Sequence, residues 1–127
     1  MRSLKTYCMR DYRKYEVWKN AHDMVLFVYK QVIPSFPSTE QYDLARQMKR
    51  AAYSISFNIV EGCGRNSDSD FAHFLDMSLG STHELEYCFL LGKDLGYIKE
   101  EEFRKIYRKI NEIKAKLINL IKSVRRS

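Results

Sequence analysis

The chain has 127 residues, of which 45% are hydrophobic and 30% are charged, a composition typical of one folded domain and not of a disordered chain. No apolar run approaches the roughly 20 residues that a membrane-spanning helix needs, and the N-terminus lacks the apolar segment of a signal peptide. Cys8, Cys63 and Cys88 are far apart and form no C-x-x-C pair, which favours free thiols over a disulfide framework. We therefore expect a cytoplasmic protein that contacts no membrane.

The net charge of +6 is unevenly distributed along the chain. Residues 1–14 carry five basic and one acidic side chain, and residues 99–127 carry ten basic and four acidic ones. Residues 61–98 carry two basic and seven acidic side chains. Basic ends around an acidic segment suit an anionic partner, or a contact between unlike faces of neighbouring subunits.

Residues 1–14 show no helical period and are expected to form an irregular basic arm. From residue 15 onwards, apolar side chains recur every three or four residues, which is the pattern of amphipathic helices. The expected helices cover about residues 15–33, 38–61, 68–95 and 99–124, within one domain over residues 15–127. No alternation typical of a strand and no internal repeat is present.

The ends of these helices are marked by proline, serine and glycine. Pro34 is expected to end the first helix, because proline disfavours helical geometry in the residue before it. Ser38 and Gln41 have the spacing of a capping box at the start of the second helix. Gly62 and Gly64 are expected to end that helix in left-handed conformations, and Gly96 to end the third, with Tyr97-Ile98 folding back on it.

The fourth helix has the most regular apolar pattern. Its stripe alternates in steps of three and four residues and consists of Phe103, Ile106, Ile110, Ile113, Leu117, Leu120 and Val124. Such a heptad stripe is typical of a helix packed on its neighbours with a left-handed twist. With short connections between all four helices, we predict an all-α protein, an up-down-up-down antiparallel four-helix bundle.

Several stretches of the chain resemble a known four-helix-bundle family, named after the protein encoded in intervening sequences of bacterial 23S ribosomal RNA genes. The stretches are residues 17–21 (VWKNA), 47–52 (QMKRAA), 54–65 (SISFNIVEGCGR), 80–86 (GSTHELE) and 95–98 (LGYI). The family usually has alanine where this chain has Val60. The resemblance implies a protomer that assembles as a ring-like homopentamer. A related bundle, the accessory variability protein of diversity-generating retroelements, forms a basic ring that binds nucleic acid and a reverse transcriptase.

Motifs for catalysis or metal binding are incomplete. A di-iron bundle needs two Glu-x-x-His helices and two further carboxylates, whereas only the pair Asp70 and His73 approaches that motif here. Cys63 is the best candidate nucleophile, but no histidine lies near it in the sequence to act as a base. We therefore expect no catalytic residues, no metal and no cofactor, and a protein that is not an enzyme.

A set of polar residues lies where the second helix ends and near the middle of the third. Its members, one helical turn apart in places, are Asn58, Glu61, Arg65, Ser81, Glu84 and Glu86. Buried charge persists only when it is paired and hydrogen-bonded, so we expect one polar network between the two helices that specifies the fold and the assembly. The alternative is a small anion held at the turn from Glu61 to Arg65 by Arg65 and free helix amides.

Basic residues in the arm and on two helices are the candidate nucleic-acid contacts. They are Arg10, Arg13, Lys14, Arg46, Lys49, Arg50, Arg104, Lys105, Arg108 and Lys109. In the homopentamer that the resemblance implies, +6 per chain becomes about +30 per ring, enough to attract a polyanion strongly at low salt. Four tyrosines lie among basic residues and could stack on bases: Tyr7, Tyr12, Tyr15 and Tyr107.

We therefore expect a non-enzymatic protein that binds RNA, or less favourably DNA, with little sequence specificity. The alternative is a protein-interaction scaffold that docks a partner such as a reverse transcriptase or another polymerase, in which case the charge serves solubility alone.

Overall fold

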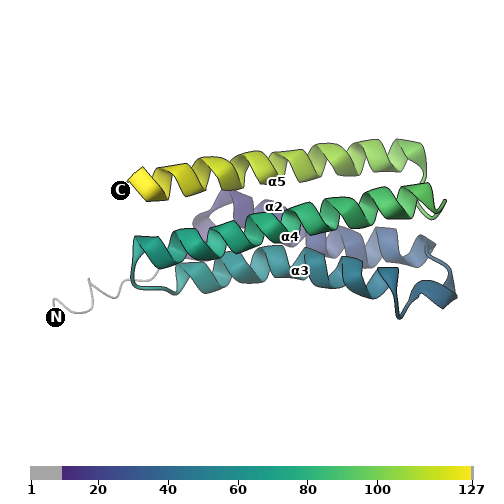
Figure 1. Cartoon of the computed structure of the whole chain (residues 1–127), viewed down its shortest axis with the longest axis horizontal. Coiled ribbons are helices and arrows are strands. Elements are labelled where there is room, and N and C mark those ends of the chain that lie inside the picture. Colours follow the sequence, from purple (N-terminus) through teal and green to yellow (C-terminus); the bar gives the residue numbers. More distant parts are fainter. Residues whose placement is uncertain (1–9, 127) are drawn as a thin grey trace.

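The computed structural model describes residues 10–126, so most of the predicted basic arm, including Tyr7, lies outside the described residues. Within that range the chain is all helical and contains no strand. The four long helices are α2 (Glu16–Phe27), α3 (Leu44–Cys63), α4 (Asp68–Asp94) and α5 (Glu100–Arg126). They lie side by side in an elongated bundle (Figure 1). The links from α3 to α4 and from α4 to α5 are short, whereas residues 28–43 between α2 and α3 include three short helical turns. The predicted four-helix fold is confirmed.

Each helix packs against two neighbours. α3 contacts α2 and α4, and α5 also contacts α4 and α2, so α3 and α5 occupy opposite corners of the bundle. Consecutive helices run antiparallel, and α3 and α5 therefore begin at the same end of the molecule (Figure 1). None of the described helices combines the length and the hydropathy that a membrane span requires.

The α5 stripe is buried largely as predicted. Ile106, Ile110, Ile113 and Leu117 are fully enclosed. Near its end, Ile121 is buried, whereas Leu120 and Val124 are only partly covered. A straight α-helix has 3.6 residues per turn and drifts away from a 3.5-residue repeat, so the buried position has moved one residue along by the last turns.

The first helix ends differently from the prediction. The α-helix stops at Phe27 and continues as a π-helical turn, Val28–Val32, and a 3-10 turn, Ile33–Ser35. Val28, Val32 and Ile33 are all buried. The wider π-helical turn changes the rotation of the side chains, which keeps all three in the core. It leaves Tyr29 exposed beside α3.

The predicted capping box at Ser38 does not form, and α3 begins at Leu44 instead. Ser38–Glu40 is a separate 3-10 turn. The Glu40 carboxylate accepts hydrogen bonds from the Leu44 backbone amide at 3.3 Å and from the Tyr97 hydroxyl at 2.7 Å. These two bonds hold the segment before α3 as a turn against the end of α4.

The glycines after α3 do not adopt the predicted left-handed conformation. Gly62 is buried within α3, and Gly64 has φ −84°. Among the described residues, Gly96 alone has a positive φ, 85°. As predicted, it ends the third helix, and the backbone amides of Tyr97 and Ile98 donate to the Gly92 carbonyl at 2.8 and 3.3 Å. Gly62 serves instead to let α4 approach closely.

Candidate nucleic-acid interface

Seven of the predicted basic contacts lie at one end of the bundle. Arg46, Lys49 and Arg50 belong to the first half of α3 and the remaining four to the first half of α5, and both helices begin at that end (Figure 1). The four on α5 are Arg104, Lys105, Arg108 and Lys109. The two groups flank the C-terminal part of α2 on either side. The Lys49 ammonium lies 5.4 Å from the centre of the Tyr29 ring, and that of Lys109 lies 5.5 Å from the centre of the Phe27 ring.

These seven side chains share a lack of acidic partners. Within residues 10–126, none of them has a carboxylate at ion-pair distance, and six of the seven are exposed. In the other half of α5, by contrast, Lys114 pairs with Glu86, Lys116 with Glu16 and Glu112, and Arg125 with Asp76. Uncompensated positive charge is therefore concentrated at the end where α3 and α5 begin.

An open hollow of about 560 Å³ lies within this basic region, between the π-helical turn that continues α2 and the first half of α3. Three cations and three tyrosines line it, together with Gln41: Arg46, Lys49, Arg50, Tyr29, Tyr42 and Tyr53. The tyrosine side chains are 43%, 82% and 38% exposed, in that order along the chain. The π-helical turn positions Tyr29, and the turn before α3 positions Tyr42.

These three tyrosines were not among the candidate contacts predicted from the sequence. Tyr42 and Tyr53 flank the basic cluster at residues 46–50 in the sequence, and that spacing was the available signal. Tyr29 is separated from the cluster by a turn and lies beside it only because the two helices pack together. No local sequence pattern therefore predicts that Tyr29 lines the hollow.

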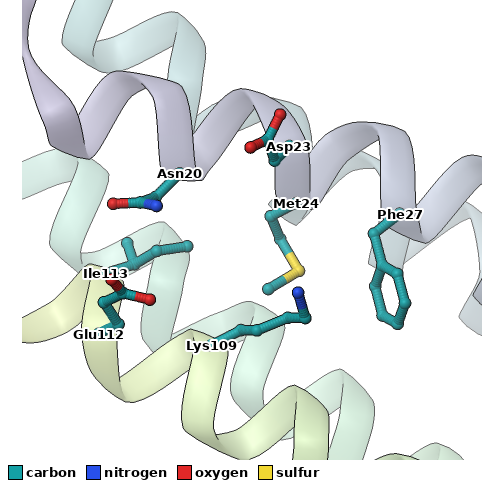
Figure 2. Close-up of a pocket in the computed structure, with 7 residues that line it drawn as sticks. All are labelled: Asn20, Asp23, Met24, Phe27, Lys109, Glu112 and Ile113. Atoms are coloured by element: carbon teal, nitrogen blue, oxygen red, sulfur yellow. The ribbon is translucent and has the colours of Figure 1, made fainter.

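Two further hollows lie between α2 and α5. One, of about 530 Å³, is lined by the cations Lys99, Lys105 and Lys109 but also by Glu101 and Glu102, so its charges partly cancel. The other measures about 80 Å³, which is small beside the roughly 300–1,000 Å³ of typical ligand pockets. In Figure 2 the Lys109 side chain extends towards Met24 and Phe27 in this smaller hollow.

Arg10, a predicted nucleic-acid contact, is bound instead to other residues of the bundle. Its guanidinium pairs with Asp68, donates to the Arg65 carbonyl at 2.9 Å and lies 4.3 Å from the centre of the Phe71 ring. Its backbone amide donates to the Cys63 carbonyl at 3.2 Å. Arg10 therefore fastens the start of the described chain to the junction of α3 and α4 and is not free for a phosphate.

The other predicted contacts before α2 remain at the surface. Arg13 pairs with Asp11 at 3.1 Å, which compensates its charge although its side chain is 69% exposed. Lys14 is exposed. Of the tyrosines predicted to stack on bases, Tyr12 packs edge-on against Trp18 and Tyr15 against Phe71. Among the described ones, Tyr107 alone is exposed, at 43%.

Part of the predicted polar network joins α3 to α4. The hydroxyls of Ser54 and Ser81 are 2.8 Å apart, and the Asn58 side-chain amide donates to the Ser54 carbonyl at 2.9 Å and to its hydroxyl at 3.1 Å. The buried Ser78 hydroxyl donates to the Ile55 carbonyl at 2.8 Å. These bonds set the register of the two helices.

The predicted carboxylates do not join this network, so the expectation of a single network is wrong. Glu86 pairs with Lys114 of α5, and Glu84 is exposed. Five residues along a helix turn the side chain by about 140°, so Glu86 faces α5 while Ser81 faces α3. Glu61 and Arg65 form a separate exposed ion pair at 3.1 Å.

The turn after α3 carries little free charge for an anion. The Arg65 guanidinium faces the Glu61 carboxylate and lies 4.6 Å from the centre of the Phe74 ring. Burial raises the pKa of the neighbouring Cys63 thiol to about 11, and that of Cys88 likewise to about 11. Both thiols are therefore protonated at neutral pH, a state in which cysteine is a poor nucleophile.

Known proteins share both sequence features and the fold of this chain. The sequence model of the 23S rRNA-intervening sequence protein family matches residues 13–119, which is most of the chain. The chain belongs to this family. A crystal structure of a protein of unknown function from the S23 ribosomal protein family of Bacteroides thetaiotaomicron is similar to the chain, with a TM-score of 0.77 and 25% sequence identity, over 84% of this chain and 95% of that one.

The two chains therefore share the fold over nearly the whole length of the solved one. Its own function is unknown, so it indicates no ligand or partner. No curated protein matches the chain.

Proposed function

We propose that this member of the 23S rRNA-intervening sequence protein family is a non-enzymatic cytoplasmic protein that binds nucleic acid, and RNA in preference to DNA. The observation that carries the proposal is the group of seven cations that have no carboxylate partner among the described residues and lie where α3 and α5 flank α2.

Phosphate contacts dominate this kind of binding. Each cation that neutralises a phosphate releases condensed counterions, so the affinity falls steeply as salt is added. Contacts to phosphates carry no base information, and six of the seven cations extend from α3 and α5 as exposed side chains around α2. The proposed binding is therefore tight at low salt and only weakly dependent on sequence.

The test is the salt dependence of RNA affinity, measured by fluorescence anisotropy with an end-labelled RNA. For the unchanged protein we expect a large loss of affinity between about 50 and 200 mM salt. Arg50→Gln with Arg104→Gln removes one cation from each helix and should lower the slope of log K against log salt by roughly one to two.

The matched control is Lys93→Gln with Arg125→Gln, which removes the same charge from residues that are paired with Asp94, Glu100 and Asp76. It should change the slope little. Equal affinity at both salt concentrations would contradict the proposal and would favour a scaffold that docks a protein partner. The proposal would also be contradicted if the control variant lowered the slope as much as the test variant does.

We also propose that the protein assembles as a ring-like homopentamer, which multiplies its charge. Two features support this proposal. Phe57 and Met77 are 66% and 44% exposed on the outer side of α3 and α4, and apolar side chains at this exposure suit a subunit contact. In addition, α4 carries six acidic residues and one lysine, whereas α5 carries nine basic and four acidic residues, so unlike faces of neighbouring copies attract.

Native mass spectrometry of the freshly purified protein tests the assembly. A single species of five chains is the expected result, and a monomer would contradict it. The ratio of absorbance at the nucleic-acid and protein maxima, taken on the same sample, reports co-purified nucleic acid.

A further inference from the structure

The hollow between α2 and α3 has a composition that charge alone does not explain. Phosphate neutralisation needs cations but no aromatic rings, and yet Tyr29, Tyr42 and Tyr53 line this hollow beside Arg46, Lys49 and Arg50. The cationic row on α5 has one exposed tyrosine, Tyr107, which stacks on Phe103 of its own helix. The two basic groups therefore differ in their aromatic residues: the hollow combines its cations with three exposed tyrosines, whereas the α5 row has one, which is already stacked on Phe103.

The tyrosines of the hollow contribute little to the core. Tyr42 is 82% exposed and makes no hydrogen bond, ion pair or ring contact with another described residue. Tyr29 contacts the Lys49 ammonium, and Tyr53 packs edge-on against the exposed Phe57 at 5.7 Å. Three large rings exposed together around one hollow are costly for a surface that has no ligand.

The size and the charge of the hollow match a nucleotide. Its volume of about 560 Å³ lies inside the range of roughly 300–1,000 Å³ for small-molecule sites. The three cations of the hollow outnumber the two carboxylates of the adjoining turn. Glu40 accepts a hydrogen bond from the Tyr97 hydroxyl, and Asp43 is exposed and has no cation at ion-pair distance within residues 10–126. The guanidinium groups would bind phosphate, and the tyrosine rings offer flat faces to a base.

We infer that this hollow is a stacking site for unpaired bases of a single-stranded nucleic acid, with Tyr42 and Tyr29 against the bases and Arg46, Lys49 and Arg50 against the adjoining phosphates. The inference rests on the proposed nucleic-acid binding and adds to it a preference for single strands. In a duplex the base faces are covered by neighbouring bases, so the tyrosines gain nothing there. Stacking on an aromatic side chain tolerates every base.

The experiment compares a labelled oligoadenylate RNA of about 12 nucleotides, within the range of single-strand site sizes, with a duplex of the same length. Tyr42→Ala should weaken single-strand binding about tenfold, since stacking contributes roughly 1–3 kcal/mol per base. Duplex binding and the salt slope should stay unchanged, because no phosphate contact is removed. Tyr42→Phe keeps the ring and should bind like the unchanged protein.

The matched control is Tyr87→Ala, which removes a tyrosine that is 61% exposed on α4, outside the hollow. It should leave both affinities unchanged. The inference is overturned if Tyr42→Ala has no effect, if it weakens single-strand and duplex binding equally, or if Tyr87→Ala matches it. In those cases salt-dependent binding by the unchanged protein still supports the proposed function.

A final competition experiment distinguishes a site for a nucleic-acid strand from a site for a free nucleotide. Adenosine 5′-monophosphate should compete only at concentrations far above those of the oligonucleotide, because one nucleotide engages few phosphate contacts. Competition at matching concentrations would overturn the single-strand inference in favour of a mononucleotide site. Failure of the unchanged protein to bind any RNA at low salt would overturn both the inference and the proposed function.

Discussion

Gly62 of α3 and Gly80 of α4 are both helical glycines, and their surroundings differ sharply. A Cβ atom built on Gly62 would lie 2.9 Å from Cβ of Phe74 and 3.3 Å from the Phe71 carbonyl oxygen. The same atom on Gly80 would meet nothing within 4 Å. At the residue scale, Gly62 thus sets how closely the two helices approach, whereas Gly80 has no packing partner.

Gly62→Ala should lower the free energy of unfolding by roughly 1–3 kcal/mol, as overpacking in a filled core does. The matched control, Gly80→Ala, should raise it by roughly 0.5–1 kcal/mol, because alanine loses less backbone entropy in a helix. Urea denaturation followed by circular dichroism measures both. Similar effects of the two substitutions would contradict the close approach at Gly62.

At the scale of one element, α5 is an amphipathic helix whose two faces can be compared at adjacent positions. Leu117 is fully buried between its neighbours, and Ile118 is 39% exposed. The stripe that buries Leu117 continues through the four-residue step to Ile121. The stability that α5 contributes therefore comes from one face.

Leu117→Ala should destabilise the protein by roughly 2–5 kcal/mol, through lost burial and the cavity left behind. Ile118→Ala should cost roughly 0.5 kcal/mol or less, since it is a surface substitution. Thermal or chemical unfolding distinguishes them. An equally large effect at both positions would mean that α5 is rotated relative to this structure or that Ile118 is buried by another subunit.

At the scale of the whole molecule, the group of seven cations that have no carboxylate partner within residues 10–126 lies where α3 and α5 begin. The exposed apolar side chains Phe57 and Met77 lie further along α3 and α4. The hydrogen bonds from Ser54 to Ser81 and from Ser78 to the Ile55 carbonyl set a register that places Phe57 and Met77 at the same level. We propose this pair as part of the surface that is buried against a second copy.

Phe57→Ser with Met77→Ser should therefore lower the native mass to that of smaller assemblies while leaving the helical circular dichroism unchanged. Removing two large exposed side chains costs little within one protomer but removes apolar area from the subunit contact. Leu26→Ser on α2, where the side chain is 40% exposed, is the control, and it should keep the native mass. An unchanged mass in the double variant would place the contact elsewhere.

Much of the architecture was predictable because it depends on local pattern. Apolar spacing of three and four residues indicated the four helices, and Gly96 indicated the end of the third, as its positive φ confirms. The errors arose at helix ends: the start of α3 depends on Glu40 meeting Tyr97, which lies 57 residues away. No local motif could outweigh that contact.

The candidate site was predictable only in part, for the same reason. The cations of α3 and α5 followed from the sequence, because long basic side chains are expected on an exposed helix face. That Arg10 is tied to Asp68, that Glu86 faces Lys114, and that Tyr29 joins Tyr42 in one hollow were decided by tertiary structure. Helix periodicity determines which side chains share a face, whereas the rotation and register of packed helices determine which faces meet.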